Sequence, residues 1–181
     1  MSEKIVQGDL LYHSVHGLCR VREIIKEKHS SKEVHSYSLV PKLISQAKVR
    51  FVIAASDVEN SGFHSPVSIK EANEILDYLK KGNKAVSSAP SAPPKAGASQ
   101  PQNETWCLAQ AILSFSNDKS EAKDQRKRQL LERSAKGLIG ELAFVLEMTV
   151  KEAAARVRKS LTSASKVNPL VLAALANAVE D

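Results

Sequence analysis

A proline-rich stretch near the middle of the chain constrains its fold more than any other feature. Between Asn83 and Glu104, prolines 90, 93, 94 and 101 lie among alanine, serine and glycine. Such a segment cannot bury enough apolar surface to offset its chain entropy, and its prolines favour extended backbone. We therefore expect two domains, residues 1–82 and 105–181, joined by a flexible linker over residues 83–104.

The first of these domains carries the signals of β-strands. Strand patterns cover residues 10–12, 18–25, 34–40 and 48–54. In the last of these, Val49, Phe51 and Ile53 alternate with Lys48, Arg50 and Val52, which predicts one apolar face. Several short strands in sequence predict a small all-β barrel. One helix, opening at Ser65-Pro66 and stopping at Gly82, is expected to follow in the same domain.

The second domain is predicted to be a compact all-α bundle. Apolar residues recur at helical spacing within 108–115, 130–145 and 150–161. Thr149 and Glu152 have the spacing of a capping box at the start of the third helix. Asn168-Pro169 is typical of an N-cap and first-turn proline, which predicts a fourth helix.

The chain has no motif that points to catalysis. The histidines are scattered, Cys19 and Cys107 lie far apart, and no phosphate loop, nucleophile elbow or carboxylate pair is present. We expect no enzyme activity, metal, cofactor or small-molecule substrate. The N-terminus lacks the blocks of a signal peptide, and the apolar run over 170–179 is too short for a bilayer, so a cytoplasmic protein without a membrane partner is expected.

Charge clustering favours a polyanionic partner. The net charge is +6, and Arg126, Lys127 and Arg128 form a basic cluster with Lys123 nearby. Such clusters hold phosphates through charge, without reading sequence. The alternative is a solvated face balanced by the neighbouring acidic residues 118, 121, 124 and 132. Arg126, Arg133 and Lys136 are not expected to share one face of the helix.

The order of several motifs resembles the CarD family of bacterial RNA-polymerase-binding transcription regulators, whose N-terminal domain is shared with the transcription-repair coupling factor. The N-terminal likeness rests on residues 8–12, His16-Gly17 and residues 57–62, and the C-terminal likeness on residues 130–136 and 140–143. Together they cover roughly residues 5–82 and 107–161. The resemblance implies a Tudor-like barrel that docks on polymerase and a basic helical domain that meets promoter DNA.

The resemblance also implies which residues make these contacts. An exposed barrel strand would pair with the polymerase β subunit, with Lys48, Arg50 and Val52 facing the partner. Alternatively, Lys48 and Arg50 are edge-protecting charges that block aggregation. Arg128 matches a basic residue of the family's DNA-facing helix.

Trp106 has two interpretations. In the family a tryptophan wedges into the upstream edge of the transcription bubble, and apolar wedges of this kind unstack bases. Here the linker occupies that stretch, and Trp106 instead falls just before the helix that matches the family's second one. We favour the alternative, in which Trp106 seals the end of a small core.

A regulator that stabilises the promoter open complex is the leading hypothesis. A free DNA-binding protein and a protein–protein adaptor are the alternatives. Residues 140–160 also read as a helix-turn-helix whose second helix bears several basic residues, but the turn has Glu147-Met148 where a glycine is usual, which disfavours sequence-specific operator binding.

Overall fold

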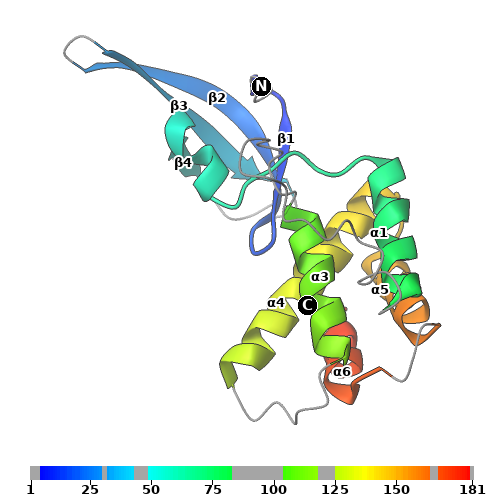
Figure 1. The fold of residues 1–181 in the computed structure, drawn as a ribbon. Coiled ribbons are helices and arrows are strands. Elements are labelled where there is room, and N and C mark those ends of the chain that lie inside the picture. Colours follow the sequence, from blue (N-terminus) through cyan, green and yellow to red (C-terminus); the bar gives the residue numbers. More distant parts are fainter. Residues whose placement is uncertain are drawn as a thin grey trace, which may run out of the picture. The chain divides into compact units, whose positions relative to one another are not determined.

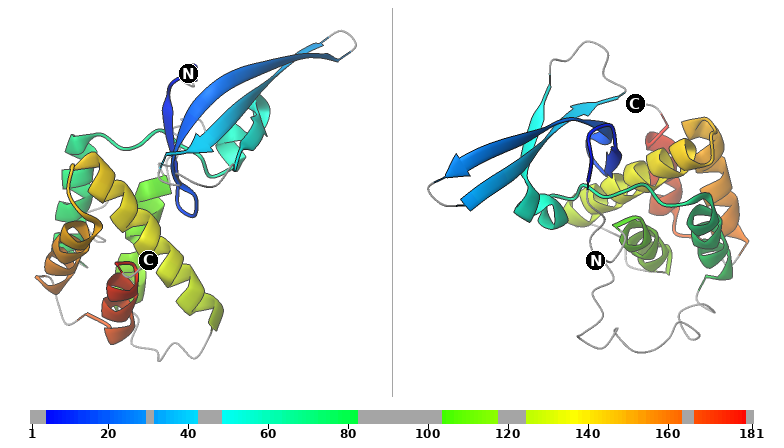
Figure 2. Two further views of the ribbon diagram at one scale, coloured as in Figure 1. Left: turned by 180° about the vertical axis from the view of Figure 1, so that it is seen from behind. Right: turned by 90° about the horizontal axis from the view of Figure 1, so that it is seen from above.

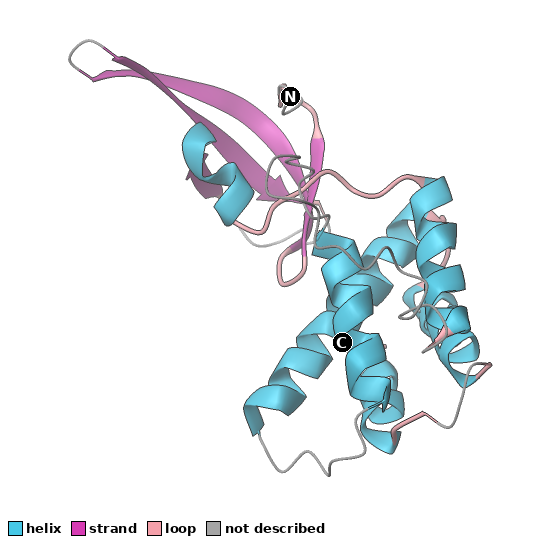
Figure 3. Ribbon diagram, viewed as in Figure 1, coloured by secondary structure: helices cyan, strands magenta, loops and turns pink. Residues whose placement is uncertain are grey.

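The chain folds into two compact units, Met1–Pro66 and Val67–Asp181. A computed structural model describes residues 5–29, 32–42, 49–82, 104–117, 125–163 and 167–179. The first unit is built on a β-sheet and the second on helices (Figures 1 and 3). Among the described residues, no helix combines the length and apolar character needed to cross a membrane.

A four-stranded antiparallel sheet forms the β unit. Its strands are β1 (Leu10–His13), β2 (Gly17–His29), β3 (Lys32–Pro41) and β4 (Phe51–Ala54), in that spatial order. The 3-10 helix η1 (Ala55–Asn60) follows β4. The strands expected over 10–12, 18–25 and 34–40 are confirmed, whereas the strand expected over 48–54 begins only at Phe51. Because β2 and β3 pair far beyond the ends of β1 and β4, their outer halves form a two-stranded ribbon (Figure 1).

The two outer strands of the sheet differ in their pairing. On its outer side, β1 forms a bridge with His64: the Tyr12 amide donates to the His64 carbonyl at 2.8 Å, and the His64 amide donates to the Tyr12 carbonyl at 3.0 Å. The outer side of β4 has no strand partner among the described residues. Within those residues the sheet is therefore open between β1 and β4.

A small apolar core lies on one face of this sheet. Its buried members come from three strands and the segment after η1: Leu11, Cys19, Val21, Leu39 and Phe63. Phe51 and Ile53 pack against them, as the alternation predicted, but Val49 precedes β4 and is 40% exposed, so its expected place in the core is wrong. Burial raises the pKa of the Cys19 thiol to about 11, which keeps that thiol protonated near neutral pH.

Five described helices make up the helical unit (Figure 2). They are α1 (Ile69–Lys81), α3 (Glu104–Asn117), α4 (Gln125–Val145), α5 (Val150–Thr162) and α6 (Pro169–Asn177). The core draws on all five, and the apolar stripes of α3, α4 and α5 contribute to it as expected. Leu130 and Val150 depart from that expectation, because they lie near the starts of α4 and α5 and are 54% and 42% exposed.

Helix α1 belongs to the helical unit. Its buried side chains, Ala72, Ile75 and Leu79, lie in the same core as those of α3, α4, α5 and α6. The expected domain boundary at Gly82 is therefore displaced to Pro66, and Glu104 is the first residue of α3 instead of the last linker residue. Residues 83–103, the rest of the expected linker, lie outside the described residues, but they join two helices of one unit.

A buried glutamate accepts a hydrogen bond from the segment that leads into α1 and so links it to the helical unit. Glu141 of α4 is fully buried, and its carboxylate accepts hydrogen bonds from the Val67 amide at 3.0 Å and the Thr105 hydroxyl at 2.8 Å. Buried carboxylates require such partners, because an unsatisfied one is costly. Three segments thus meet at one side chain: the start of α1, the start of α3 and the middle of α4.

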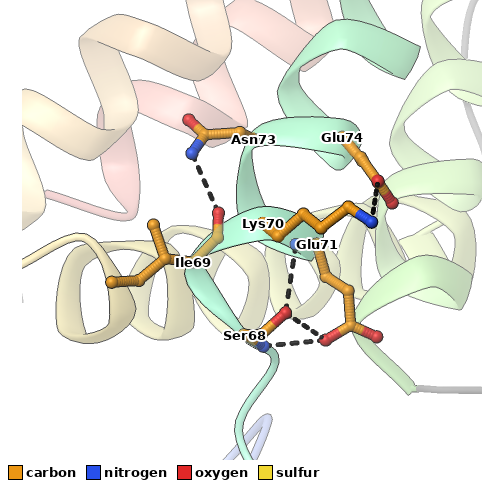
Figure 4. Close-up of polar contacts among 6 residues, drawn as sticks. All are labelled: Ser68, Ile69, Lys70, Glu71, Asn73 and Glu74. Carbon is orange, nitrogen blue, oxygen red and sulfur yellow. Dashed lines mark hydrogen bonds and ion pairs between the residues drawn. The ribbon is translucent and has the colours of Figure 1, made fainter.

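The helix starts follow local capping rules. Ser68 caps α1 in a capping box with Glu71 (Figure 4), so the helix begins three residues after the expected Pro66. The expected stop at Gly82 is confirmed, where a φ of 56° suits glycine. The capping box of Thr149 and the Asn168-Pro169 start of α6 are confirmed as well.

Candidate functional site

Among the described residues of the β unit, strand β4 is the sheet edge that lacks a strand partner. Val52 is the most exposed of its side chains, at 57%, and pairs in register with Ser38 of β3. Backbone groups along such an edge can pair with a further strand. Of the three residues expected to face a partner, Lys48 lies outside the described residues, while Arg50 and Val52 lie at the start of this edge.

Arg50 is engaged with the sheet itself. Its guanidinium Nε donates to the Ser38 hydroxyl at 2.7 Å, and its Nη2 forms an ion pair with Glu23 of β2. Ser38 is buried, whereas the Arg50 and Glu23 side chains remain about half exposed. Arg50 therefore links the start of β4 to β3 and β2. Its side chain nevertheless stays about half exposed, as an edge charge would. Sequence reasoning missed Glu23 and Ser38, because only the strand register brings them to Arg50.

The basic cluster lies on the first turns of α4. Arg126, Lys127 and Arg128 are all exposed, and the first turn holds no acidic residue. Lys123 lies outside the described residues. Cations near a helix N-terminus oppose the helix dipole, whereas a bound anion would be favoured there. The cluster is thus placed where an anionic partner lowers the free energy of the helix start.

The basic surface continues along α4. Arg133 and Lys136 are exposed, whereas the nearby Leu131, Ser134 and Leu138 are buried on the other side of the helix. At 3.6 residues per turn, seven residues are nearly two turns, so Arg126 and Arg133 lie on one stripe with Lys136 at its side. Arg126 and Arg133 therefore share a stripe, while Lys136 lies about 80° round the helix from Arg126.

Trp106 packs within the helical unit. It is half-buried on α3, lies against the core, and meets Tyr78 of α1 edge to face with ring centroids 5.6 Å apart. Burial raises the pKa of Tyr78. This placement agrees with a residue that seals the core, and it joins α3 to α1.

The turn between α4 and α5 forms without glycine. Glu147 adopts a left-handed conformation with φ of 51°. The Met148 amide donates to the Ala143 carbonyl at 3.0 Å and the Glu147 amide to the Phe144 carbonyl at 3.3 Å, the pattern of a Schellman motif. The missing glycine therefore does not prevent α5 from following α4 closely.

Within the described ranges, no three His, Cys, Asp or Glu side chains gather as a metal site would require. No protein-family model matches the chain, and no curated protein matches it either.

Proposed function

We propose that the chain is a non-enzymatic, CarD-like transcription regulator that binds the RNA polymerase β subunit and stabilises the promoter open complex through upstream DNA. The observation that carries the proposal is the edge of β4, whose outer side has no strand partner among the described residues and which exposes Val52; β-augmentation uses a strand of this kind. A Tudor-like barrel, implied by the resemblance, is part of the proposal, with the outer side of β4 left free to pair with the partner.

The DNA part of the proposal rests on the exposed cluster Arg126, Lys127 and Arg128, with Arg133 and Lys136 further along α4. Their spread over several turns suits a phosphate backbone more than a single anion. The β unit and the helical unit follow each other directly at Pro66–Val67. Binding of one unit would therefore raise the effective concentration of the other at its site, so neither contact need be strong.

Photo-crosslinking of the full chain tests the polymerase contact. A photoreactive residue at Val52 should give an adduct with the β subunit of purified polymerase, whereas one at Val34, also exposed but on the outer ribbon, should give little. Equal labelling from both positions, or none from Val52, would contradict docking through β4.

Fork-junction DNA binding tests the second contact. Lys127→Ala/Arg128→Ala should weaken binding similarly for all sequences and lower the salt slope by up to about 1.8, at roughly 0.9 per lost phosphate contact. Arg22→Ala/Lys26→Ala removes the same charge from the β unit and is the control. Polymerase binding without DNA binding would favour a protein–protein adaptor, and DNA binding without polymerase binding a free DNA-binding protein.

A further inference from the structure

Positive charge in the helical unit is concentrated on two helices. Helices α3 and α6 hold no basic residue, and α1 holds equal numbers of acidic and basic residues. The remaining cations of the described helices lie on α4 and on α5, whose sequence VKEAAARVRKSLT has four basic residues and one acidic residue. The basic residues of α5 play no part in the function proposed above.

Helix α5 separates its apolar and basic residues cleanly. Its buried side is formed by small and branched side chains, namely Ala153, Ala154, Val157 and Leu161. Its basic side chains are all exposed, namely Lys151, Arg156, Arg158 and Lys159. The one acidic side chain, Glu152, is held at the helix start, where its carboxylate accepts hydrogen bonds from the Thr149 amide and hydroxyl, both at 2.9 Å.

Most cations of α5 lack a neutralising partner among the residues that the structure describes. The side chains of Lys151, Arg158 and Lys159 have no hydrogen-bond or ion-pair partner among the described residues, and Arg156 lies near Glu152. Lys151 and Arg158 are seven residues apart on one stripe, about 10 Å at 1.5 Å per residue, with the small Ala155 between them. A polyanion can approach this stripe closely.

We propose that the exposed face of α5 binds the phosphate backbone of duplex DNA, as a second surface separate from the first turns of α4. Its net positive charge and the exposed stripe of Lys151, Ala155 and Arg158 complement a backbone. An acidic protein partner fits less well, because Val150 is the one large apolar side chain that α5 exposes within the described part of the chain, and protein interfaces usually need apolar anchors. A membrane surface fits less well too, because the apolar side of α5 is used in the core.

The position of α5 makes this surface independent of the α4 cluster. Helix α4 has 21 residues, about 31 Å at 1.5 Å per residue, and α5 begins after its far end. Figures 1 and 2 show α5 beside α1, away from the first turns of α4. A duplex that contacts both the exposed face of α5 and the first turns of α4 would be bound over a longer stretch than either surface alone could cover.

Duplex binding by the full chain tests the inference. Lys151→Ala/Arg158→Ala should weaken binding to a 30-base-pair duplex by roughly tenfold at low salt and lower the salt slope by about 1.8, irrespective of sequence. Arg22→Ala/Lys26→Ala, with equal loss of charge, should change both much less. Because Lys151 and Arg158 are exposed, the thermal unfolding of the variant should match that of the parent.

The outcomes separate this inference from the DNA contact of α4. Loss in the Lys127→Ala/Arg128→Ala variant but not in the α5 variant overturns the inference and leaves the proposed function standing. Loss in the α5 variant alone supports the inference and removes DNA from the role of α4. If the α5 variant binds duplex like the charge control but no longer binds polymerase, α5 meets an acidic protein surface and the inference is wrong.

Discussion

At the scale of single residues, Arg50 shows how one side chain serves both the sheet and a proposed contact. Its guanidinium reaches across β3 to Glu23 while about half of its side chain stays exposed. Exposed ion pairs contribute at most about 1 kcal/mol, and the hydrogen bond to Ser38 adds a similar amount. An acidic group on a partner could therefore share the guanidinium without unfolding the β unit.

Charge reversal at Arg50 should weaken polymerase binding, and a charge swap can show why. Arg50→Glu places two carboxylates together, so some loss of stability is expected beside the loss of binding. Glu23→Arg/Arg50→Glu restores an ion pair of opposite sense and should unfold like the parent, yet still bind polymerase more weakly with an altered salt dependence. Pull-down across salt concentrations measures this. Full binding by the swapped variant would limit Arg50 to holding the sheet together.

Glu147 is the residue with the clearest backbone cost. A side chain in the left-handed region is disfavoured by about 1 kcal/mol, a cost that glycine avoids. Glu147→Gly should therefore stabilise the helical unit by about 1 kcal/mol in urea unfolding. Glu147→Ala removes the charge but keeps the strain, so it should give no such gain. Equal gains from both variants would attribute the effect to charge.

At the scale of elements, the capping boxes of α1 and α5 make stability depend on pH. Hydrogen bonds from the amide and hydroxyl of Ser68 lower the pKa of Glu71 below its usual 4.5, and those of Thr149 lower that of Glu152. A carboxylate with a lowered folded-state pKa stabilises the fold above its unfolded pKa, and this stabilisation is lost as pH falls through the folded value.

Removing the charge of both capping boxes should therefore reduce stability only at pH values above the lowered pKa of each glutamate. Glu71→Gln/Glu152→Gln should be less stable than the parent at pH 7, and the two should converge as the pH falls through the lowered pKa values of the two glutamates. Urea unfolding at several pH values measures the difference. Glu74→Gln, which removes only the exposed ion pair with Lys70, is the control and should show a smaller gap. A gap that stays constant as the medium is acidified would mean that the charge of Glu71 and Glu152 is not what stabilises these helices.

The sequence predicted the individual helices and strands better than it predicted which of them pack together. The strands, the helix stripes and the caps at Thr149 and Asn168 follow from local periodicity and local hydrogen bonds, so they could be predicted. The apolar stripe of α1 predicts a helix, but Ile75 and Leu79 cannot reveal which core they enter. Glu23 and Arg50 are 27 residues apart, and only a strand register joins them. Helical geometry alone places Arg126 and Arg133 on one stripe, because seven residues are nearly two turns.

At the scale of the whole molecule, the boundary between the units sets which fragments fold. Residues 67–181 retain the entire helical core, whereas residues 105–181 lack the buried Ile75 and Leu79, worth about 1.5–3 kcal/mol each. Fragment 67–181 should unfold cooperatively on heating, and fragment 105–181 should not. Circular dichroism and calorimetry of both fragments measure this. A cooperative transition in the shorter fragment would show that α1 is dispensable to the core.

The hydrogen bond between Val67 and Glu141 also decides how the molecule bears tension. A force pulling the β unit away enters the helical unit at Val67, beside a buried carboxylate that also holds Thr105 of α3. The pull therefore reaches the middle of α4 and the start of α3 at once, so that α1 cannot peel away before its bond to Glu141 breaks. When the chain is pulled from Met1, the force should therefore load all three segments that meet at Glu141. The helical unit should begin to unfold only after these contacts break together.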